Sequence, residues 1–326
     1  MLENKINLEV IYKIVPQMRN YYEIGKTYFP YLMFFQNHNY RSEVVNTDNR
    51  GFRYCTKENE IIKNFNNKQN LPLGLLVGNS LAFGVGAAGD RYTIPSMLND
   101  ISDLLWFNLG GRACNMTQEL LLFLFYRPLF KNIKKVIIVS GINDLSLYHL
   151  SKKYSRDFGA FFFSEDYQNE LNKLHSPIHI SDDIKLSIPK AKKKNKNDLL
   201  YILKRELTNW KLLSRSLGFD LYFVLQPFAL WLKNNFSEEE KLLFKELDKQ
   251  EGDWHILKQV MDKKEYLWFA NSLQKICESK NIPFMDLNSE LCKYQPDEKW
   301  LFVDRIHLTN SGYRLVSNIL NKHFLK

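Results

Sequence analysis

The side chains of Ser80, Asn143, Asp304 and His307 are of the types that proteins use for nucleophilic acyl chemistry. A serine hydroxyl is a poor nucleophile at neutral pH and needs an imidazole within hydrogen-bond reach to take its proton. Asp304 and His307 are three residues apart, so this carboxylate could orient the imidazole and stabilise its charged form. The amide of Asn143 is a donor that could stabilise an oxyanion. Each residue alone is as well explained as a cap or a turn residue, so the hypothesis needs a fold that brings the four together.

The elements around these residues predict such a fold. Apolar runs that indicate buried strands come before three of the sites, at Leu73–Val77, Leu104–Asn108 and Lys135–Ser140. Helical patterns follow them at Ile94–Asp103, Thr117–Phe130 and, after a polar interval, Leu199–Leu217. Asp220–Gln226 and Ile282–Leu287 are two further strand candidates. An alternating pattern of this kind predicts a parallel sheet whose carboxyl ends gather the ligand-binding residues, so Ser80, Ala113, Asn143 and His307 should converge there.

Four motifs in this order, GNS at Ser80, NLGGRA at Ala113, GIND at Asn143 and DRIH at Asp304 and His307, resemble the blocks of the SGNH hydrolases, also called the GDSL family. The resemblance covers about residues 71–326. It implies a three-layer α/β/α fold resembling flavodoxin, with a five-stranded parallel sheet, and ester hydrolysis or acyl transfer through an acyl-serine. Ser80 would then be the nucleophile and an oxyanion donor, His307 the base, Asp304 its orienting carboxylate and Asn143 a second oxyanion donor. The resemblance implies no cofactor and no metal.

Two positions depart from the family pattern. Asn79 stands where an aspartate usually precedes the nucleophile, which should matter little because that residue is not the base. Ala113 stands where a glycine is expected to donate its backbone N–H to the oxyanion. Any residue except proline has this N–H if its backbone angles are allowed. Ala113 is therefore the first choice for this donor, and Gly111 the second.

Two other motifs in the chain could indicate a different chemistry, but each fits its pattern poorly. Gly84–Gly89 matches the glycine pattern of dinucleotide-binding loops, but it begins too far after the strand, and the second strand lacks the acidic end that holds a ribose. These glycines are better explained as a loop beside Ser80 that moves over the substrate or lets it approach. His175 and His179 have helical spacing, but Pro177 between them breaks the helix that a shared metal would need.

Composition predicts a globular chain without a nucleic-acid partner. The 326 residues are 45% hydrophobic and carry a net charge of +9. Six lysines between Lys185 and Lys196 account for most of this excess, and without them the net charge would be +3. This cluster has no interleaved aromatic residues for base stacking and is interpreted as a solvated loop. Because no secretory signal or membrane span is visible in the sequence, a cytoplasmic protein with reduced thiols is expected.

The domain organisation is expected to have two parts. Residues 1–70 would form an extension packed on the hydrolase domain at 71–326, and an insertion at about 148–198 could act as a lid or specificity cap. Within the extension, Asn7–Phe35 predicts one or two helices, and Asn46–Arg53 predicts a turn followed by a short strand.

The function expected from these observations is that of a cytoplasmic serine esterase or deacylase acting on a small acyl ester, with an O-acetylated sugar as the favoured substrate. Two alternatives stay open. One is an O-acyltransferase that uses the same triad, and the other is a catalytically silent binding protein on the same fold. The sequence does not indicate an oligomeric state.

Overall fold

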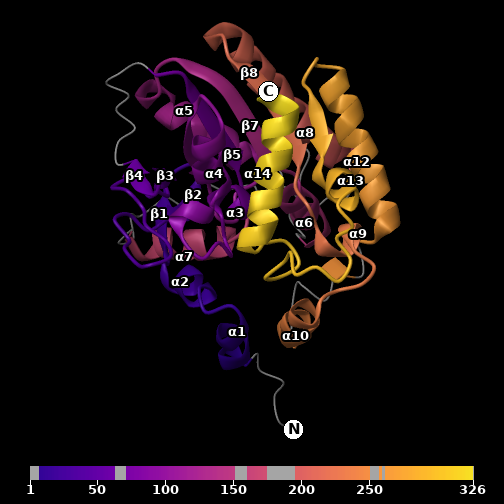
Figure 1. Cartoon of the computed structure of the whole chain (residues 1–326). Helices are drawn as coiled ribbons and strands as arrows, with labels where there is room; N and C mark the ends of the chain where they lie inside the picture. The colour runs from indigo at the N-terminus through magenta and orange to yellow at the C-terminus, as the bar shows by residue number, and fades with distance from the viewer. Residues whose placement is uncertain are drawn as a thin grey trace, which may run out of the picture.

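The structure is a computed structural model that describes residues 7–62, 71–150, 160–174, 195–249, 257–258 and 261–325. At its centre lies a five-stranded parallel sheet in the order β6-β5-β7-β8-β9 (Figure 1). The strands are β5 (Leu73–Gly78), β6 (Leu105–Gly110), β7 (Ile133–Ser140), β8 (Asp220–Leu225) and β9 (Phe284–Asp286). Counted along the chain this order is 2-1-3-4-5, that of flavodoxin-like sheets. The predicted sheet is therefore confirmed, with boundaries that differ by a few residues.

Two apolar cores, one on each face of the sheet, explain why the strands read as continuous apolar runs. Successive side chains of a strand point to opposite faces. In β7, Val136 and Ile138 accordingly belong to one core, whereas Ile137 and Val139 belong to the other. A parallel sheet with both faces covered needs apolar residues at every position, and the alternation typical of a half-exposed strand is lost.

Helices on the two faces complete the three-layer architecture. The first core is covered by α5 (Met116–Tyr126), α8 (Lys196–Leu217) and α12 (Lys263–Glu278). The second is covered by α4 (Ile94–Ile101), α13 (Leu287–Cys292) and α14 (Asn310–Phe324), the last of which lies in front of the sheet in Figure 1. Two shorter helices, α9 (Ala229–Leu232) and α10 (Glu238–Leu247), follow β8. The α/β/α sandwich expected from the sequence is thus present.

The N-terminal segment differs from the prediction of one or two helices over Asn7–Phe35. Two short helices, α1 (Leu8–Ile14) and α2 (Met18–Glu23), are followed by an antiparallel hairpin of β1 (Lys26–Phe29) and β2 (Met33–Gln36). Pro30 explains the difference, because proline in a helix interior removes a hydrogen bond and clashes with the preceding turn. The hairpin turn instead lies at residues 30–32, where Tyr31 has φ +69°, and β2 begins with Met33 at the same φ.

The turn expected at Asn46–Arg53 is present. The carboxylate of Asp48 accepts the N–H groups of Arg50 and Phe52, at 2.8 and 2.9 Å, and a bridge between Thr47 and Arg53 closes the turn. The short strand that follows is β3 (Cys55–Lys57), which pairs antiparallel with β4 (Glu60–Ile62).

The helix after β7 begins earlier than the sequence suggested. A polar interval was expected between this strand and Leu199–Leu217, but α6 (Ile142–Leu150) starts immediately after Gly141. A further helix, α7 (Ser164–Leu174), lies within the insertion expected at 148–198. Residues 151–159 and 175–194 of that insertion, and with them His175 and His179, lie outside the described residues.

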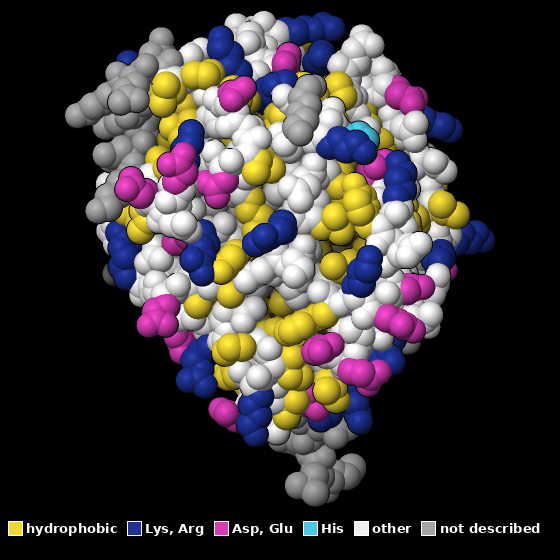
Figure 2. Space-filling model, in the orientation of Figure 1, with side chains coloured by type: hydrophobic (Ala, Val, Ile, Leu, Met, Phe, Trp, Pro, Cys, Tyr) yellow, Lys and Arg dark blue, Asp and Glu magenta, His cyan; other side chains and the backbone are white. Residues whose placement is uncertain are grey.

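Charges of both signs are interspersed over the face of the molecule shown in Figure 2. Of the lysine cluster, Lys185 to Lys194 lie outside the described residues, whereas Lys196 pairs with Glu265 at 2.5 Å and lies 3.8 Å from the ring centroid of Trp268. Among the helices of the described residues, none has the length and the apolar character that a membrane crossing requires.

Candidate active site

Ser80 lies where β5 ends, at the first position of the short helix α3 (Ser80–Phe83). The chain turns sharply at Gly78, where a Cβ atom would lie 2.1 Å from the carbonyl oxygen of Val139. Asn79 caps the helix, because its Oδ1 accepts the N–H of Leu81 at 3.0 Å. Capping is a role that asparagine and aspartate share, so the departure at Asn79 leaves the position of the serine intact.

The other end of α3 is held by two side chains from distant parts of the chain. Asn108, in β6, donates its amide to the carbonyl oxygen of Ala82 at 3.0 Å. Arg53, which is completely buried, donates to the carbonyl oxygen of Gly84 at 2.8 Å and forms an ion pair with Asp90 at 2.8 Å. These donors satisfy carbonyl groups that a helix end leaves without partners. The position of Ser80 is therefore fixed from both ends of its helix.

The loop Gly84–Gly89 is part of the packed scaffold. Tyr21 donates its hydroxyl to two carbonyl oxygens of this loop, and Gln17 and Tyr313 each donate to one, at distances of 2.6–2.9 Å. All its residues except Ala88 are buried. The expectation of a loop that moves over the substrate therefore does not fit these contacts. The loop instead connects the N-terminal segment and α14 to the helix that carries Ser80.

Ser80, His307 and Asp304 form a continuous chain of hydrogen bonds. The Nε2 atom of His307 lies 2.7 Å from Oγ of Ser80, and its Nδ1 atom lies 2.6 Å from Oδ2 of Asp304. The side chains of His307 and Asp304 are 12% and 13% exposed, so both are largely buried. The structure thus brings together the three residues that the sequence analysis placed in this order, across 227 positions of the chain.

The turn that carries Asp304 orients both its oxygen atoms. Oδ1 accepts the backbone N–H groups of Ile306 and His307, each at 2.8 Å, while Oδ2 faces the imidazole. Burial alone would raise the pKa of Asp304, but the charge of His307 and these hydrogen bonds outweigh it and hold this pKa below its ordinary value. Thr309 caps α14 by accepting the N–H of Gly312 at 3.2 Å, so Asp304 is not needed for that role.

The backbone near Ala113 distinguishes the two candidate donors of the sequence analysis. Gly111 donates its N–H to the carbonyl oxygen of Gly78 at 2.9 Å, so this group is already used within the fold. Within the described part of the chain, the N–H groups of Ala113 and Ser80 have no acceptor. Ala113 has φ +56°, a left-handed conformation that glycine adopts more readily than alanine. This angle gives a physical reason why a glycine is expected at the position.

Asn143, the second residue of α6, has its side chain at the same place. Its Nδ2 atom donates to the carbonyl oxygen of Cys114 at 2.7 Å, which fixes the amide and leaves its second hydrogen for another acceptor. The side chain is 6% exposed and lines a cavity. Ala113 and Asn143 are thus tied to each other through Cys114, so their two donors are arranged before any ligand binds.

Two buried carboxyl groups below Asn143 are functional candidates that the sequence analysis missed. Asp144 accepts the N–H of Met116 at 3.2 Å, and burial raises the pKa of Asp144 to about 7. Burial and the charge of Asp144 raise the pKa of Glu119 well above its ordinary value, and one of its oxygens, Oε1, accepts the hydroxyl of Ser140 at 2.7 Å. For Glu119 the signal in the sequence was an acid directly before the apolar run Leu120–Phe125.

Metal-ligating side chains do not gather anywhere in the described ranges, where no group of three or more histidines, cysteines or acids comes together. Cys55, Cys114 and Cys277 are buried as free thiols, and burial raises the pKa of Cys55 to about 12. Cys114 takes part in the site through its carbonyl oxygen.

No family model matches the sequence, and neither does any curated protein. Solved structures do match. An acetyl xylan esterase is 14% identical, with a TM-score of 0.41, over 77% of this chain and 98% of its own. A lipolytic protein of the G-D-S-L family from Veillonella parvula is 10% identical (TM-score 0.42; 77% and 97%), and a catalytic mutant of an acetylxylan esterase from Geobacillus stearothermophilus is 12% identical (TM-score 0.42; 77% and 93%). The chain is thus similar, at low sequence identity, to solved structures of acetyl xylan esterases and of a lipolytic protein of the G-D-S-L family.

Proposed function

We propose that this protein is a serine hydrolase of the SGNH type that cleaves an acyl ester through an acyl-serine intermediate. The observation that carries the proposal is the chain of hydrogen bonds from Ser80 through His307 to Asp304, with distances of 2.7 and 2.6 Å. Such a chain has the geometry required to activate a serine hydroxyl.

In the first half of the reaction, Oγ of Ser80 attacks the ester carbonyl carbon while Nε2 of His307 takes the hydroxyl proton. Asp304 keeps Nδ1 of the imidazole protonated and stabilises the imidazolium that forms. The negative charge on the carbonyl oxygen would be stabilised by the N–H groups of Ser80 and Ala113 and by the free hydrogen of the Asn143 amide. Loss of one such donor typically lowers the rate by about 100- to 1000-fold.

The tetrahedral intermediate then collapses: the bond between the carbonyl carbon and the alcohol oxygen breaks, His307 gives the proton to the departing alcohol, and the acyl group stays on Ser80. A water molecule then attacks the acyl-serine with His307 again as the base, which releases the acid and restores the hydroxyl. An acceptor alcohol in place of this water would give acyl transfer, the alternative considered from the sequence. No described residue selects between water and an alcohol, so the partition of the acyl group between the two should be measured.

The alcohol component that we propose is a sugar hydroxyl, on the basis of the family resemblance. We also propose a cytoplasmic location, because the four cysteines are free thiols, as is usual in reducing compartments.

A fluorophosphonate probe, which reacts with activated serines, tests the mechanism directly. The wild-type protein should be labelled and should hydrolyse p-nitrophenyl acetate, whereas Ser80→Ala should remain folded and lose both properties. Ser216, exposed at the end of α8, provides a matched control, and Ser216→Ala should behave as wild type. Labelling or turnover that persists in Ser80→Ala would rule out Ser80 as the nucleophile.

A further inference from the structure

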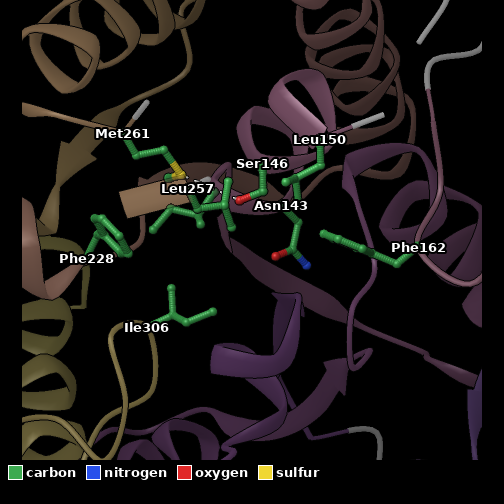
Figure 3. A pocket seen from close by; sticks show the side chains of 9 residues that line it. Asn143, Ser146, Leu150, Phe162, Phe228, Leu257, Met261 and Ile306 are labelled. Atoms are coloured by element: carbon green, nitrogen blue, oxygen red, sulfur yellow. Dashed lines mark hydrogen bonds between the residues drawn. The ribbon is translucent and has the colours of Figure 1, made fainter. Parts of the chain in front are cut away.

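A cavity of about 180 Å³ lies between α6 and the segments that follow β8 (Figure 3). Its lining is apolar except for Asn143 and Ser146, and the buried side chains of Phe228 and Met261 form part of its wall. The hydroxyl of Ser146 points to the sulfur of Met261 at 3.7 Å and so is already partnered within the wall. The amide of Asn143 is the polar group of this lining that remains for a ligand.

The cavity adjoins the place where the acyl carbonyl would lie. Asn143, the proposed oxyanion donor, is part of its lining, and so is Ile306, the neighbour of His307 in the chain. In Figure 3 the Asn143 amide faces the space between Phe162 and Ile306. An ester whose carbonyl oxygen contacts this amide would have its acyl chain at the entrance of the cavity.

We infer that this cavity binds the acyl chain of the substrate, and that the preferred ester carries an unbranched apolar acyl group of about six carbons rather than an acetyl group. A cavity of about 150 Å³ lined by leucine, isoleucine and phenylalanine holds one benzene molecule, so the present one has room for about six carbon atoms. This inference rests on the proposed function and departs from the O-acetyl group expected from the sequence.

The chemistry of the wall excludes a sugar from the same space. Sugar hydroxyls that leave water need hydrogen-bond partners, and an unpartnered hydroxyl in an apolar environment is strongly disfavoured. The wall offers only Asn143 and the partnered hydroxyl of Ser146. A sugar would therefore occupy the alcohol side of the ester, near His307, while methylene groups fill the cavity.

Chain-length dependence provides the test. With p-nitrophenyl esters of increasing acyl length, kcat/KM should rise by about 4-fold for each methylene buried, so the hexanoyl ester, which has four methylenes more, should exceed the acetyl ester by about 250-fold. Beyond about eight carbons the value should level off or fall, because the cavity is full. A kcat/KM that is highest for acetyl and falls with length would overturn the inference. If wild type hydrolyses none of the esters and is not labelled by the fluorophosphonate, the proposed function itself fails instead.

Two variants with opposite effects connect the preference to this cavity. Ser146→Leu places a larger side chain in the space and should lower the hexanoyl-to-acetyl ratio by at least 10-fold. Met261→Ala enlarges the space and should move the optimum to acyl chains longer by about two carbons. Because the two variants act in opposite directions, the test can still be decided if one of them fails to fold. Ser216→Leu on the exposed surface is the control and should leave the ratio unchanged. An unchanged optimum in both cavity variants would show that the acyl chain binds elsewhere.

Discussion

The carboxylate of Asp304 uses its two oxygens for different purposes, and this makes its catalytic contribution separable from its structural one. Oδ1 fixes the turn through two backbone N–H groups, whereas Oδ2 contacts the imidazole of His307. An asparagine can keep the first set of bonds with its own oxygen. Its NH₂ group would then face Nδ1 and favour the wrong tautomer of the imidazole.

Asp304→Asn should therefore lower kcat by about 1000- to 10,000-fold with a small change in KM, while the protein stays folded. Steady-state kinetics on p-nitrophenyl hexanoate, together with a urea unfolding curve, would measure both effects. A kcat within tenfold of wild type would mean that Asp304 only shapes the turn.

The buried carboxyl of Asp144 leads to a different prediction, because its pKa is raised whereas that of Asp304 is lowered. Burial raises the pKa of Asp144 to about 7, compared with about 3.9 in an unfolded chain. Between these values the folded protein binds this proton more tightly, so the contribution to the unfolding free energy is fully present below pH 4 and is lost as pH rises to about 7. The depressed pKa of Asp304 acts in the opposite direction, at pH values below this window.

The unfolding free energy of wild type should fall between pH 5 and pH 8, and in Asp144→Asn this fall should be smaller. The difference in unfolding free energy between the variant and wild type should therefore favour the variant more at pH 8 than at pH 5. Urea unfolding at both pH values measures this difference. Asp220→Asn, at an exposed carboxylate, is the control and should leave the pH dependence unchanged. If Asp144→Asn changed the unfolding free energy by the same amount at both pH values, the assignment of the raised pKa to Asp144 would be wrong.

At the scale of elements, the turn between β6 and α5 determines which backbone N–H would be presented to the proposed oxyanion. Gly111 is engaged with Gly78, whereas Ala113 at φ +56° leaves its N–H without an acceptor in the described structure. The sequence could not distinguish Ala113 from Gly111 as the proposed donor, because the difference depends on the hydrogen bond of Gly111 to another strand. Ala113→Pro would remove this N–H, but its effect would not be informative. The proline ring requires φ near −65°, whereas Ala113 has φ +56°.

Ala113→Gly is the informative change in this turn. Glycine relieves the left-handed strain of alanine but increases the entropy of the unfolded chain, so the unfolding free energy should change by less than about 1 kcal/mol. Because the donor belongs to the backbone, kcat should stay within about 3-fold of wild type. A larger fall in kcat would show that the methyl group of Ala113 itself is needed in the site.

The elements that were predicted correctly are those whose patterns are local. Parallel strands covered on both faces are visible as apolar runs, and their common direction brings Ser80, Asn143 and His307 to one edge of the sheet. The β1-β2 hairpin was missed because its aromatic residues were interpreted as a helical face despite Pro30. The acids Asp144 and Glu119 were missed because their burial depends on how α5 and α6 pack against α8, which is distant in the sequence.

For the whole molecule, Arg53 connects the N-terminal segment to α3, the helix that carries Ser80. It is buried, pairs with Asp90, and also donates to Tyr21 at 2.8 Å and to the carbonyl oxygen of Val44 at 2.8 Å. Removal of one partner of a buried ion pair leaves an uncompensated charge, which costs about 3–5 kcal/mol. The contacts of Arg53 therefore join residues on both sides of the boundary proposed at residue 70.

Arg53→Met should lower the unfolding free energy by about 3–5 kcal/mol in urea titrations. Arg50→Met, at a partly exposed arginine three residues away whose guanidinium lies 3.8 Å from Asp48, should cost about 1 kcal/mol or less. Similar effects of the two substitutions would mean that the buried network does not contribute specifically to stability.

The separation of 227 positions between Ser80 and His307 also determines when the chain can first become active. At synthesis rates of about 5–20 residues per second, the nucleophile leaves the ribosome roughly 10–45 s before its base. During that interval Ser80 has no imidazole to take its proton, and the nascent chain cannot react with cellular esters. Under the proposed mechanism, ester hydrolysis should therefore appear only when α14 docks beside α4, so this activity would report completed folding.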